Sequence, residues 1–302
     1  MYKARPQSNA LAAALILVAT AFIAATTLMA ESLGTDTLGA PLPALQISHG
    51  RFLFAFIALA SVAAVMRPAL SQPHWRLHIA RTTCGWAGVT LMFASVAFIP
   101  LADATAISFL NPVFAMMLAI PLLGEQVGRV RWSAAGLALI GALVLLRPAP
   151  DSFQPAAFLA MGAAMVMGME LIFIKKLAGR ENPFQILLVN NLIGLGLATC
   201  AVLPVWQAPT GAQWAVLAGI GLCMAVAQTC FVNAMARADA SFVAPISYAT
   251  LVFAAGYDAL FYGVRPDGVT YAGAAIILTG ALWLALREAR LKKPAPRVHT
   301  AL

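Results

Sequence analysis

Long uninterrupted apolar blocks recur along this chain, and they constrain its fold more than any other feature. Most run to about 19 to 23 residues, the length at which a helix crosses a hydrocarbon core roughly 30 Å thick. Only 10% of the 302 residues are charged and 62% are apolar, whereas about a quarter of a soluble domain is usually charged. The sequence therefore predicts an all-α, polytopic membrane protein of about ten transmembrane helices.

The basic residues set the expected orientation of these spans. The expected spans are 11–29, 44–66, 82–99, 104–123, 132–146, 156–177, 183–205, 214–236, 243–262 and 269–286. Of the 19 lysines and arginines, Arg51 falls inside the second span and Arg147 and Arg265 fall on one side. The other sixteen fall on the opposite side, with Lys175 and Lys176 at the end of the sixth span counted with the loop that follows. This bias predicts that both termini and a basic tail, 288–302, lie in the cytoplasm. The net charge of +8 thus reflects topology and predicts no nucleic-acid partner.

An internal echo divides the chain into two halves. Residues 102–109, Ala-Asp-Ala-Thr-Ala-Ile-Ser-Phe, are echoed at 238–245, Ala-Asp-Ala-Ser-Phe-Val-Ala-Pro, five spans later. Because an odd number of crossings separates the copies, the second must lie upside down relative to the first. We therefore expect two inverted five-helix repeats, at 11–147 and 155–287. Such repeats are typical of secondary transporters, whose substrate site lies near mid-membrane between the repeats.

These motifs also resemble a known family. The stretch from Ile-Pro-Leu-Ala-Asp at 99–103 through Leu-Leu-Gly-Glu-Gln at 122–126 resembles the first EamA-type repeat of the drug/metabolite transporter superfamily, and 238–248 resembles the matching part of the second. Arg51 and Arg81 match positions that are usually basic there. The resemblance implies ten helices, a central cavity and transport of metabolites without ATP hydrolysis. Together with the short loops, it also implies a bacterial inner-membrane protein.

The chain departs from the family pattern at one pair of positions. Gly124 and Glu125 form the expected Gly-Glu pair of the first repeat, but Gly263 and Val264 stand where the second repeat commonly carries such a pair. A role that needs both carboxylates is therefore not expected of this chain.

Charged side chains inside the spans are candidates for function, because charges are costly in hydrocarbon. Glu170 in the sixth span could take up a proton and couple a pH gradient to solute movement; alternatively it forms an ion pair with a nearby lysine or with Arg51. Arg51 could bind an anionic or carbonyl group of the solute, or could simply reach water at its helix end. Asp258 in the ninth span could face water beside Arg265.

Amides, a hydroxyl and aromatic rings form a second set of candidates for substrate binding. Asn111 precedes a proline that frees a backbone carbonyl one turn back, and Ser247 follows a proline in the equivalent helix. Helix-helix hydrogen bonds and apolar packing are the alternative roles. Aromatic stacking beside amides favours an aromatic or heterocyclic solute. The full set is Trp86, Phe93, Asn111, Asn190, Gln228, Ser247 and Tyr248.

Together these features predict a secondary transporter that works by alternating access on a small-molecule substrate in a lipid bilayer. The resembled family includes carriers that take up riboflavin or S-adenosylmethionine, and uptake of a solute such as riboflavin is the first expectation. Export of amino acids or drug-like metabolites is the alternative. A membrane-embedded enzyme is a distant third, because His74 and His78 lie four residues apart without an acidic neighbour in the sequence. No cofactor, metal or catalytic residue is expected, and the oligomeric state stays open.

Overall fold

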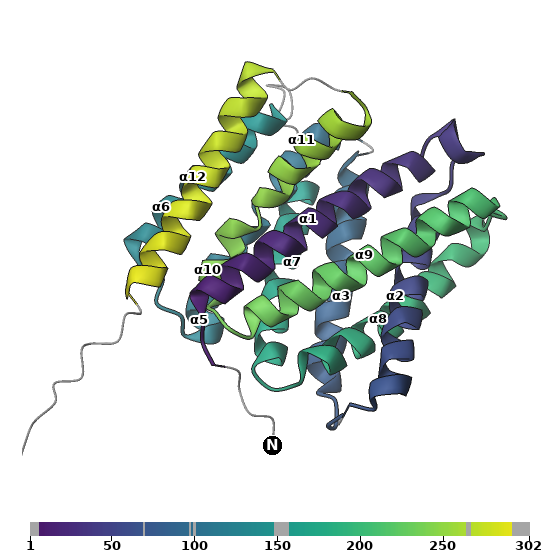
Figure 1. The fold of residues 1–302 in the computed structure, drawn as a ribbon, viewed down its shortest axis with the longest axis horizontal. Helices are drawn as coiled ribbons and strands as arrows, with labels where there is room; N and C mark the ends of the chain where they lie inside the picture. The colour runs from purple at the N-terminus through teal and green to yellow at the C-terminus, as the bar shows by residue number, and fades with distance from the viewer. Residues whose placement is uncertain are drawn as a thin grey trace, which may run out of the picture.

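The computed structural model describes residues 6–68, 70–96, 98, 101–147, 157–263 and 267–291. This described part is helical and contains no strand (Figure 1). Its main helices are α1 Asn9–Leu33, α2 Ala44–Met66, α3 Trp75–Val96, α4 Leu101–Ser108, α5 Asn111–Leu123, α6 Arg129–Leu146, α7 Ala157–Ala178, α8 Pro183–Val202, α9 Gly211–Met235, α10 Ala240–Ile246, α11 Ala249–Phe261 and α12 Gly268–Leu291. Two short 3-10 turns, Asp36–Leu38 and Leu203–Val205, follow α1 and α8.

The structure confirms a polytopic helical membrane protein. Nine segments of the described chain are long and apolar enough to cross a membrane, and α3 corresponds to the remaining expected span. It begins at Trp75, whereas the sequence predicted a start at residue 82. The difference arises because protein covers one polar face of the first turns of α3: His78 is fully buried and Arg81 is 2% exposed.

Two of the expected spans are broken into shorter helices. The fourth span consists of α4 and α5, separated at Phe109 and Leu110, and the ninth consists of α10 and α11, separated at Ser247 and Tyr248. Proline contributes to the first break, because Pro112 at the start of α5 has no N–H to donate to the preceding turn. Both breaks follow the internal echo, so the repeat is structural as well as sequential.

The helices pack in neighbouring pairs that small residues bring close together. On one flank α6 lies beside α12, and on the other α2 lies beside α8 and α9 (Figure 1). A methyl group on Gly141 of α6 would lie 2.9 Å from the carbonyl oxygen of Gly273 of α12, and one on Gly273 would lie 2.9 Å from the Gly141 carbonyl oxygen. Glycine at both positions therefore permits this close contact.

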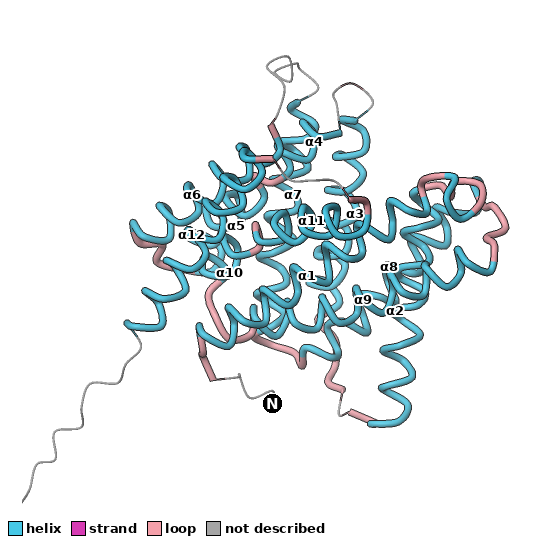
Figure 2. The backbone as a smooth tube through the Cα atoms, turned by 45° about the horizontal axis from the view of Figure 1, so that its top comes forward, coloured by secondary structure: helices cyan, strands magenta, loops and turns pink. Residues whose placement is uncertain are grey.

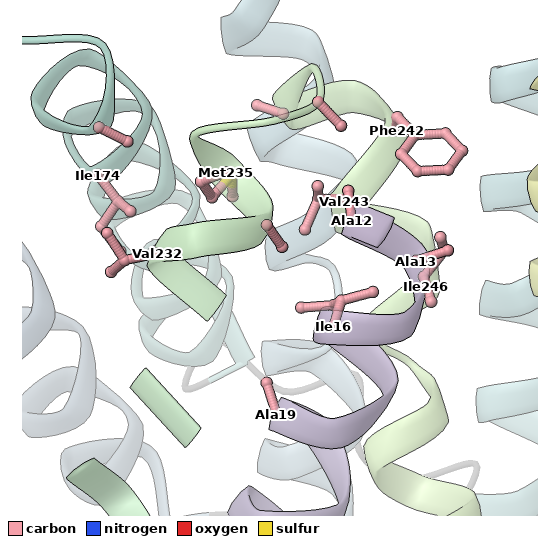
Figure 3. Close-up of a cluster of buried hydrophobic side chains, with 14 of the residues drawn as sticks. Ala12, Ala13, Ile16, Ala19, Ile174, Val232, Met235, Phe242, Val243 and Ile246 are labelled. Carbon is pink, nitrogen blue, oxygen red and sulfur yellow. The ribbon is translucent and has the colours of Figure 1, made fainter. Parts of the chain in front are cut away.

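The largest apolar core lies where α1, α7, α9 and α10 meet (Figure 3). Ile16 of α1, Val232 and Met235 of α9, and Val243 and Ile246 of α10 are all buried there. At one end of the bundle, called here the termini face, α1 begins and α12 ends, and Asn9 Nδ2 donates to Glu288 Oε2 at 3.2 Å. The opposite end, called the far face, carries α4 (Figure 2).

Candidate functional site

The two helix breaks are hydrogen-bonded to each other. The Tyr248 hydroxyl, fully buried, donates to the Phe109 carbonyl oxygen at 2.5 Å, and the two rings lie 5.9 Å apart between centroids. The carbonyl that Pro112 frees, that of Ser108, accepts a bond at 3.0 Å from Asn111 Nδ2. The irregular backbone of the fourth span is thus satisfied partly by its own side chain and partly by the other repeat.

The two halves of each broken span pack differently at the two ends of the bundle. The halves on the termini face, α5 and α10, lie against each other, and α10 also packs against α1, α6, α7, α9 and α12. Every residue of α10 is buried. No comparable packing joins α4 and α11, the halves on the far face, within the described part of the chain. Within the described residues, the two broken spans are therefore joined to each other at the termini face and not comparably at the far face.

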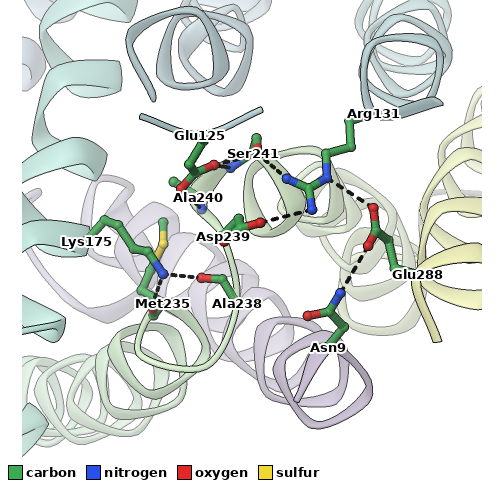
Figure 4. Close-up of polar contacts among 10 residues, drawn as sticks. All are labelled: Asn9, Glu125, Arg131, Lys175, Met235, Ala238, Asp239, Ala240, Ser241 and Glu288. Atoms are coloured by element: carbon green, nitrogen blue, oxygen red, sulfur yellow. Dashed lines mark hydrogen bonds and ion pairs between the residues drawn. The ribbon is translucent and has the colours of Figure 1, made fainter. Parts of the chain in front are cut away.

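A carboxylate of the first repeat caps a helix of the second repeat at the termini face. Glu125 Oε1 accepts from the Ala240 backbone N at 2.8 Å, and Oε2 accepts from the Ser241 backbone N at 3.0 Å and from Ser241 Oγ at 2.5 Å (Figure 4). These are unpaired donors at the start of α10, where negative charge is also favoured. Gly124 has φ +68°, a left-handed conformation that glycine adopts easily.

Arg131 of α6 joins the same region to the end of α12. Its Nη1 donates to Ser241 Oγ at 2.7 Å, its Nη2 lies 3.0 Å from Asp239 Oδ2, and its Nε lies 3.1 Å from Glu288 Oε1 (Figure 4). We call these five residues, Glu125, Arg131, Asp239, Ser241 and Glu288, the inner clasp. In the sequence, Arg131 was counted only among the charges that set the topology. The repetition of Asp103 at Asp239 was the one sequence feature that pointed to this region.

Lys175 closes this end of the bundle further. Its Nζ donates to the carbonyl oxygen of Met235 at 2.8 Å and to that of Ala238 (Figure 4). The far face shows a different kind of contact, an exposed ion pair between Arg147 and Asp267. The hydrogen bond from Arg147 holds the pKa of Asp267 below its ordinary range, but exposed pairs add little to stability.

We expect Glu125→Ala to loosen the closed termini face. Removing the carboxylate leaves the Ala240 and Ser241 N–H groups without their acceptor, so α10 separates more readily from α5 and α6. A cysteine introduced at Ala244, which is 1% exposed, should then react with a thiol reagent about tenfold faster, equivalent to losing roughly 1.4 kcal/mol of closure. The measurement uses protein whose native cysteines are replaced. An unchanged labelling rate would contradict a closing role for Glu125.

A second charged group lies deeper in the bundle. Glu170 of α7 lies with Oε1 3.8 Å from Arg81 Nε of α3, and Arg51 of α2 also interacts with it electrostatically. A methyl group on Gly85, one turn after Arg81, would lie 2.9 Å from Glu170 Oε2, so glycine there makes room for the carboxylate. We call Arg51, Arg81 and Glu170 the central triad.

The structure pairs Glu170 with Arg81 and not with a lysine, since Lys175 donates to the carbonyl groups described above. Sequence reasoning named Arg81 from the family resemblance but counted it among the loop charges. Arg51 is half-buried, with its Cζ 3.8 Å from the centroid of the Phe52 ring.

The candidate amides link α8 to its neighbours. Asn190 Oδ1 accepts from Thr82 Oγ1 of α3 at 3.1 Å. Gln228 Oε1 of α9 accepts from Asn191 Nδ2 at 3.2 Å. Thr82 follows Arg81 directly, so the α3–α8 bond lies next to the central triad. Both bonds are of the helix-helix type that was the alternative role for these residues.

Several candidates are placed elsewhere. Trp86 is 39% exposed on α3, Ser247 Oγ donates to the Ala244 carbonyl oxygen at 2.7 Å, and Asp258 lies on α11 toward the far face, partly buried. The structure assigns none of these three a hydrogen bond or ion pair to the central triad. The side chain of Phe93, like residue Arg265, lies outside the described residues.

His74 and His78 have an acidic partner that the sequence did not predict. Glu181, before α8, accepts from the His74 backbone N at 2.6 Å and contacts His74 Nδ1 at 2.8 Å and His78 Nε2 at 2.9 Å. Burial raises the pKa of Glu181, but the hydrogen bonds from both histidines outweigh it, and the pKa lies below its ordinary value. Within the described chain no His, Cys, Asp and Glu group is suited to hold a metal ion.

Comparison with known proteins agrees with this architecture. The chain is 33% identical over 266 residues to a riboflavin transporter of Rhizobium johnstonii, covering 86% of this chain and 87% of that protein. It is 26% identical over 251 residues to a pseudopaline exporter of Pseudomonas aeruginosa, covering 81% and 87%. A solved crystal structure shares the fold with a TM-score of 0.78 at 19% identity, over 95% of this chain and 100% of its own.

The model of the EamA-like transporter family matches residues 10–147 and 154–286. Together with relatives that are named as transporters, this match indicates a transporter of small molecules rather than an enzyme. The chain belongs to the EamA-like transporter family.

Proposed function

We propose that this protein is a secondary transporter that moves a small organic metabolite across the bacterial inner membrane by alternating access. The repeats at 11–147 and 155–287 are its two moving units, and both termini with the tail 288–302 are cytoplasmic. The observation that carries the proposal is the unequal packing of the broken helices: α5 and α10 are joined at the termini face, while α4 and α11 are not comparably joined at the far face. We therefore assign the termini face to the cytoplasmic side and propose that the described state is closed toward the cytoplasm.

The proposed substrate is an aromatic or heterocyclic solute such as riboflavin, and the proposed direction is uptake. The relative named as a riboflavin transporter supports it, as do the aromatic and amide side chains of the candidate set on α3, α5, α8 and α9. Export of amino acids or drug-like metabolites is the second candidate, because another relative is named as an exporter.

The roles of individual residues belong to the same proposal. Glu170 is assigned to proton coupling, with Asp258 as the alternative carboxylate. Arg51 contacts the solute directly. The proposed solute-binding set is Trp86, Phe93, Asn111, Asn190, Gln228, Ser247 and Tyr248.

The direct test is riboflavin uptake by cells that can neither make nor import riboflavin, with and without this gene, across an imposed pH gradient. We expect accumulation only in cells that carry the gene, greater when the outside is more acidic. The matched control is the same strain expressing Asp36→Asn, a change at an exposed residue of the loop after α1. No uptake from protein shown to be in the membrane would exclude riboflavin import and favour the export proposal.

A further inference from the structure

Arg81 is a buried cation whose hydrogen bonds the protein does not complete. Its side chain is 3% exposed, and its Nε and Nη1 have no hydrogen-bond partner within the described structure. Glu170 Oε1, at 3.8 Å from Nε, is close enough to attract the charge but too far to accept a hydrogen bond. Buried polar atoms in native proteins are nearly always hydrogen-bonded. The guanidinium therefore holds donors ready for acceptors that come from elsewhere.

The charges around Arg81 do not balance. Arg51 and Arg81 each carry one positive charge, and Glu170 is the carboxylate that interacts with both. The other nearby carboxylate, Glu181, is already bound by His74, His78 and Gln185. An excess positive charge inside a membrane bundle is costly unless an anion neutralises it.

Glu170 is not completely enclosed by the helices around it. α7 packs against α3, α4, α5, α8, α9 and α10, yet the Glu170 side chain remains 26% exposed. Gly85 presents no side chain beside the carboxylate. Thr82, the residue after Arg81 on α3, is hydrogen-bonded to Asn190 of α8. A solute beside Glu170 would thus meet a guanidinium and a carboxylate.

We propose that Arg81, supported by Arg51, binds a negatively charged group of the transported solute, a carboxylate or a phosphate, and that Glu170 competes with that group for the guanidinium. The planar fork of donors on arginine matches two oxygens of such a group. This inference rests on the proposed transport function but not on riboflavin, which carries no such group, and it narrows the substrate class to anionic solutes. Among solutes that share one ring system, the anionic member binds more tightly than the neutral one.

The test compares matched pairs of probes on purified full-length protein: flavin mononucleotide with riboflavin, and benzoate with benzamide. A ligand that binds only the folded state raises the free energy of unfolding by RT ln(1 + L/Kd) at free ligand concentration L, so the dependence of the unfolding temperature on ligand concentration gives an apparent Kd. We expect at least one anion to stabilise the wild type at lower concentrations than its neutral partner. Arg81→Gln should weaken that binding by at least about tenfold. Arg76→Gln, an exposed change on the same helix, should leave it unchanged.

Glu170→Gln should change the affinity for the anion in the opposite direction to Arg81→Gln. Removing the competing carboxylate should strengthen binding of the same anion by about threefold or more, a gain that a purely structural ion pair would not produce. The Glu170→Gln variant also tests the inference if Arg81→Gln does not purify as a folded protein. Equal binding of anionic and neutral partners, or no stabilisation by any probe, overturns the inference, as does an undiminished anion affinity in folded Arg81→Gln.

The two proposals fail separately. Riboflavin uptake by cells together with no preference for anions would leave transport standing and overturn the assignment of Arg81. A preference for anions that depends on Arg81, without riboflavin uptake, would sustain the assignment and reject riboflavin as the solute.

Discussion

Glu170→Gln is expected to abolish accumulation driven by a pH gradient while downhill exchange of the solute continues. The amide keeps the shape of the side chain beside Gly85 and Arg81 but cannot bind and release a proton. If one proton moves with each solute, a gradient of one pH unit supports about tenfold accumulation. We therefore expect an about tenfold ratio in the wild type to fall to about one in the variant, measured in proteoliposomes with an imposed gradient.

Asp258→Asn separates the two carboxylates that could couple transport. Because Asp258 lies toward the far face and outside the central triad, we expect this variant to keep its accumulation. Loss of accumulation in Asp258→Asn, with normal accumulation in Glu170→Gln, would move the coupling role to α11. Asp36→Asn, a change in an exposed loop, is the control and should accumulate the solute as the wild type does.

Arg131→Ala is expected to destabilise the protein by about 3 kcal/mol, because removing one partner of a buried ion pair leaves the others without compensation. Arg131 is 11% exposed and Glu288 is 10% exposed. The change would leave Glu288, Asp239 and Ser241 without their shared donor. The loss should appear as a lower midpoint of reversible unfolding in mixed micelles, followed by tryptophan fluorescence.

Arg129→Ala is the matched control for this measurement. It lies two residues away on the same helix and is exposed, so we expect a change of at most about 0.5 kcal/mol. Similar midpoints for the two variants would show that the inner clasp does not contribute to stability. Arg131→Lys should recover only part of the loss, because an ammonium group cannot replace the planar fork that reaches three partners.

The helical membrane fold could be predicted from the apolar blocks, because a span needs only length and low polarity. The breaks at Phe109–Leu110 and Ser247–Tyr248 were not predicted as ends of helices, since hydropathy is indifferent to a missing backbone hydrogen bond. The start of α3 was misplaced for a related reason: His78 and Arg81 read as loop residues, but Glu181 and Glu170 from distant parts of the chain cover them.

The candidate site was only partly predictable. Glu170 and Arg51 are recognisable because charges are rare within apolar blocks. Their relation to Arg81 depends on how α2, α3 and α7 pack, and one sequence does not reveal those neighbours. The Gly124-Glu125 pair was identified through its family resemblance, yet its partners, Ala240 and Ser241, lie in the other repeat.

The cap that Glu125 places on α10 has no matching carboxylate in the second repeat, where the sequence carries Val264 after Gly263. If all other contacts were symmetric, two inverted halves would make the two resting states equal in free energy. A charge-assisted bond worth about 1.5–3 kcal/mol would bias the empty carrier about ten- to more than a hundredfold toward the state closed at the termini face. A solute on the termini side can bind only the rarer state, which is open at the termini face. Its apparent affinity therefore falls by the same factor. The carrier would therefore show unequal half-saturation on its two sides, although its binding residues are the same.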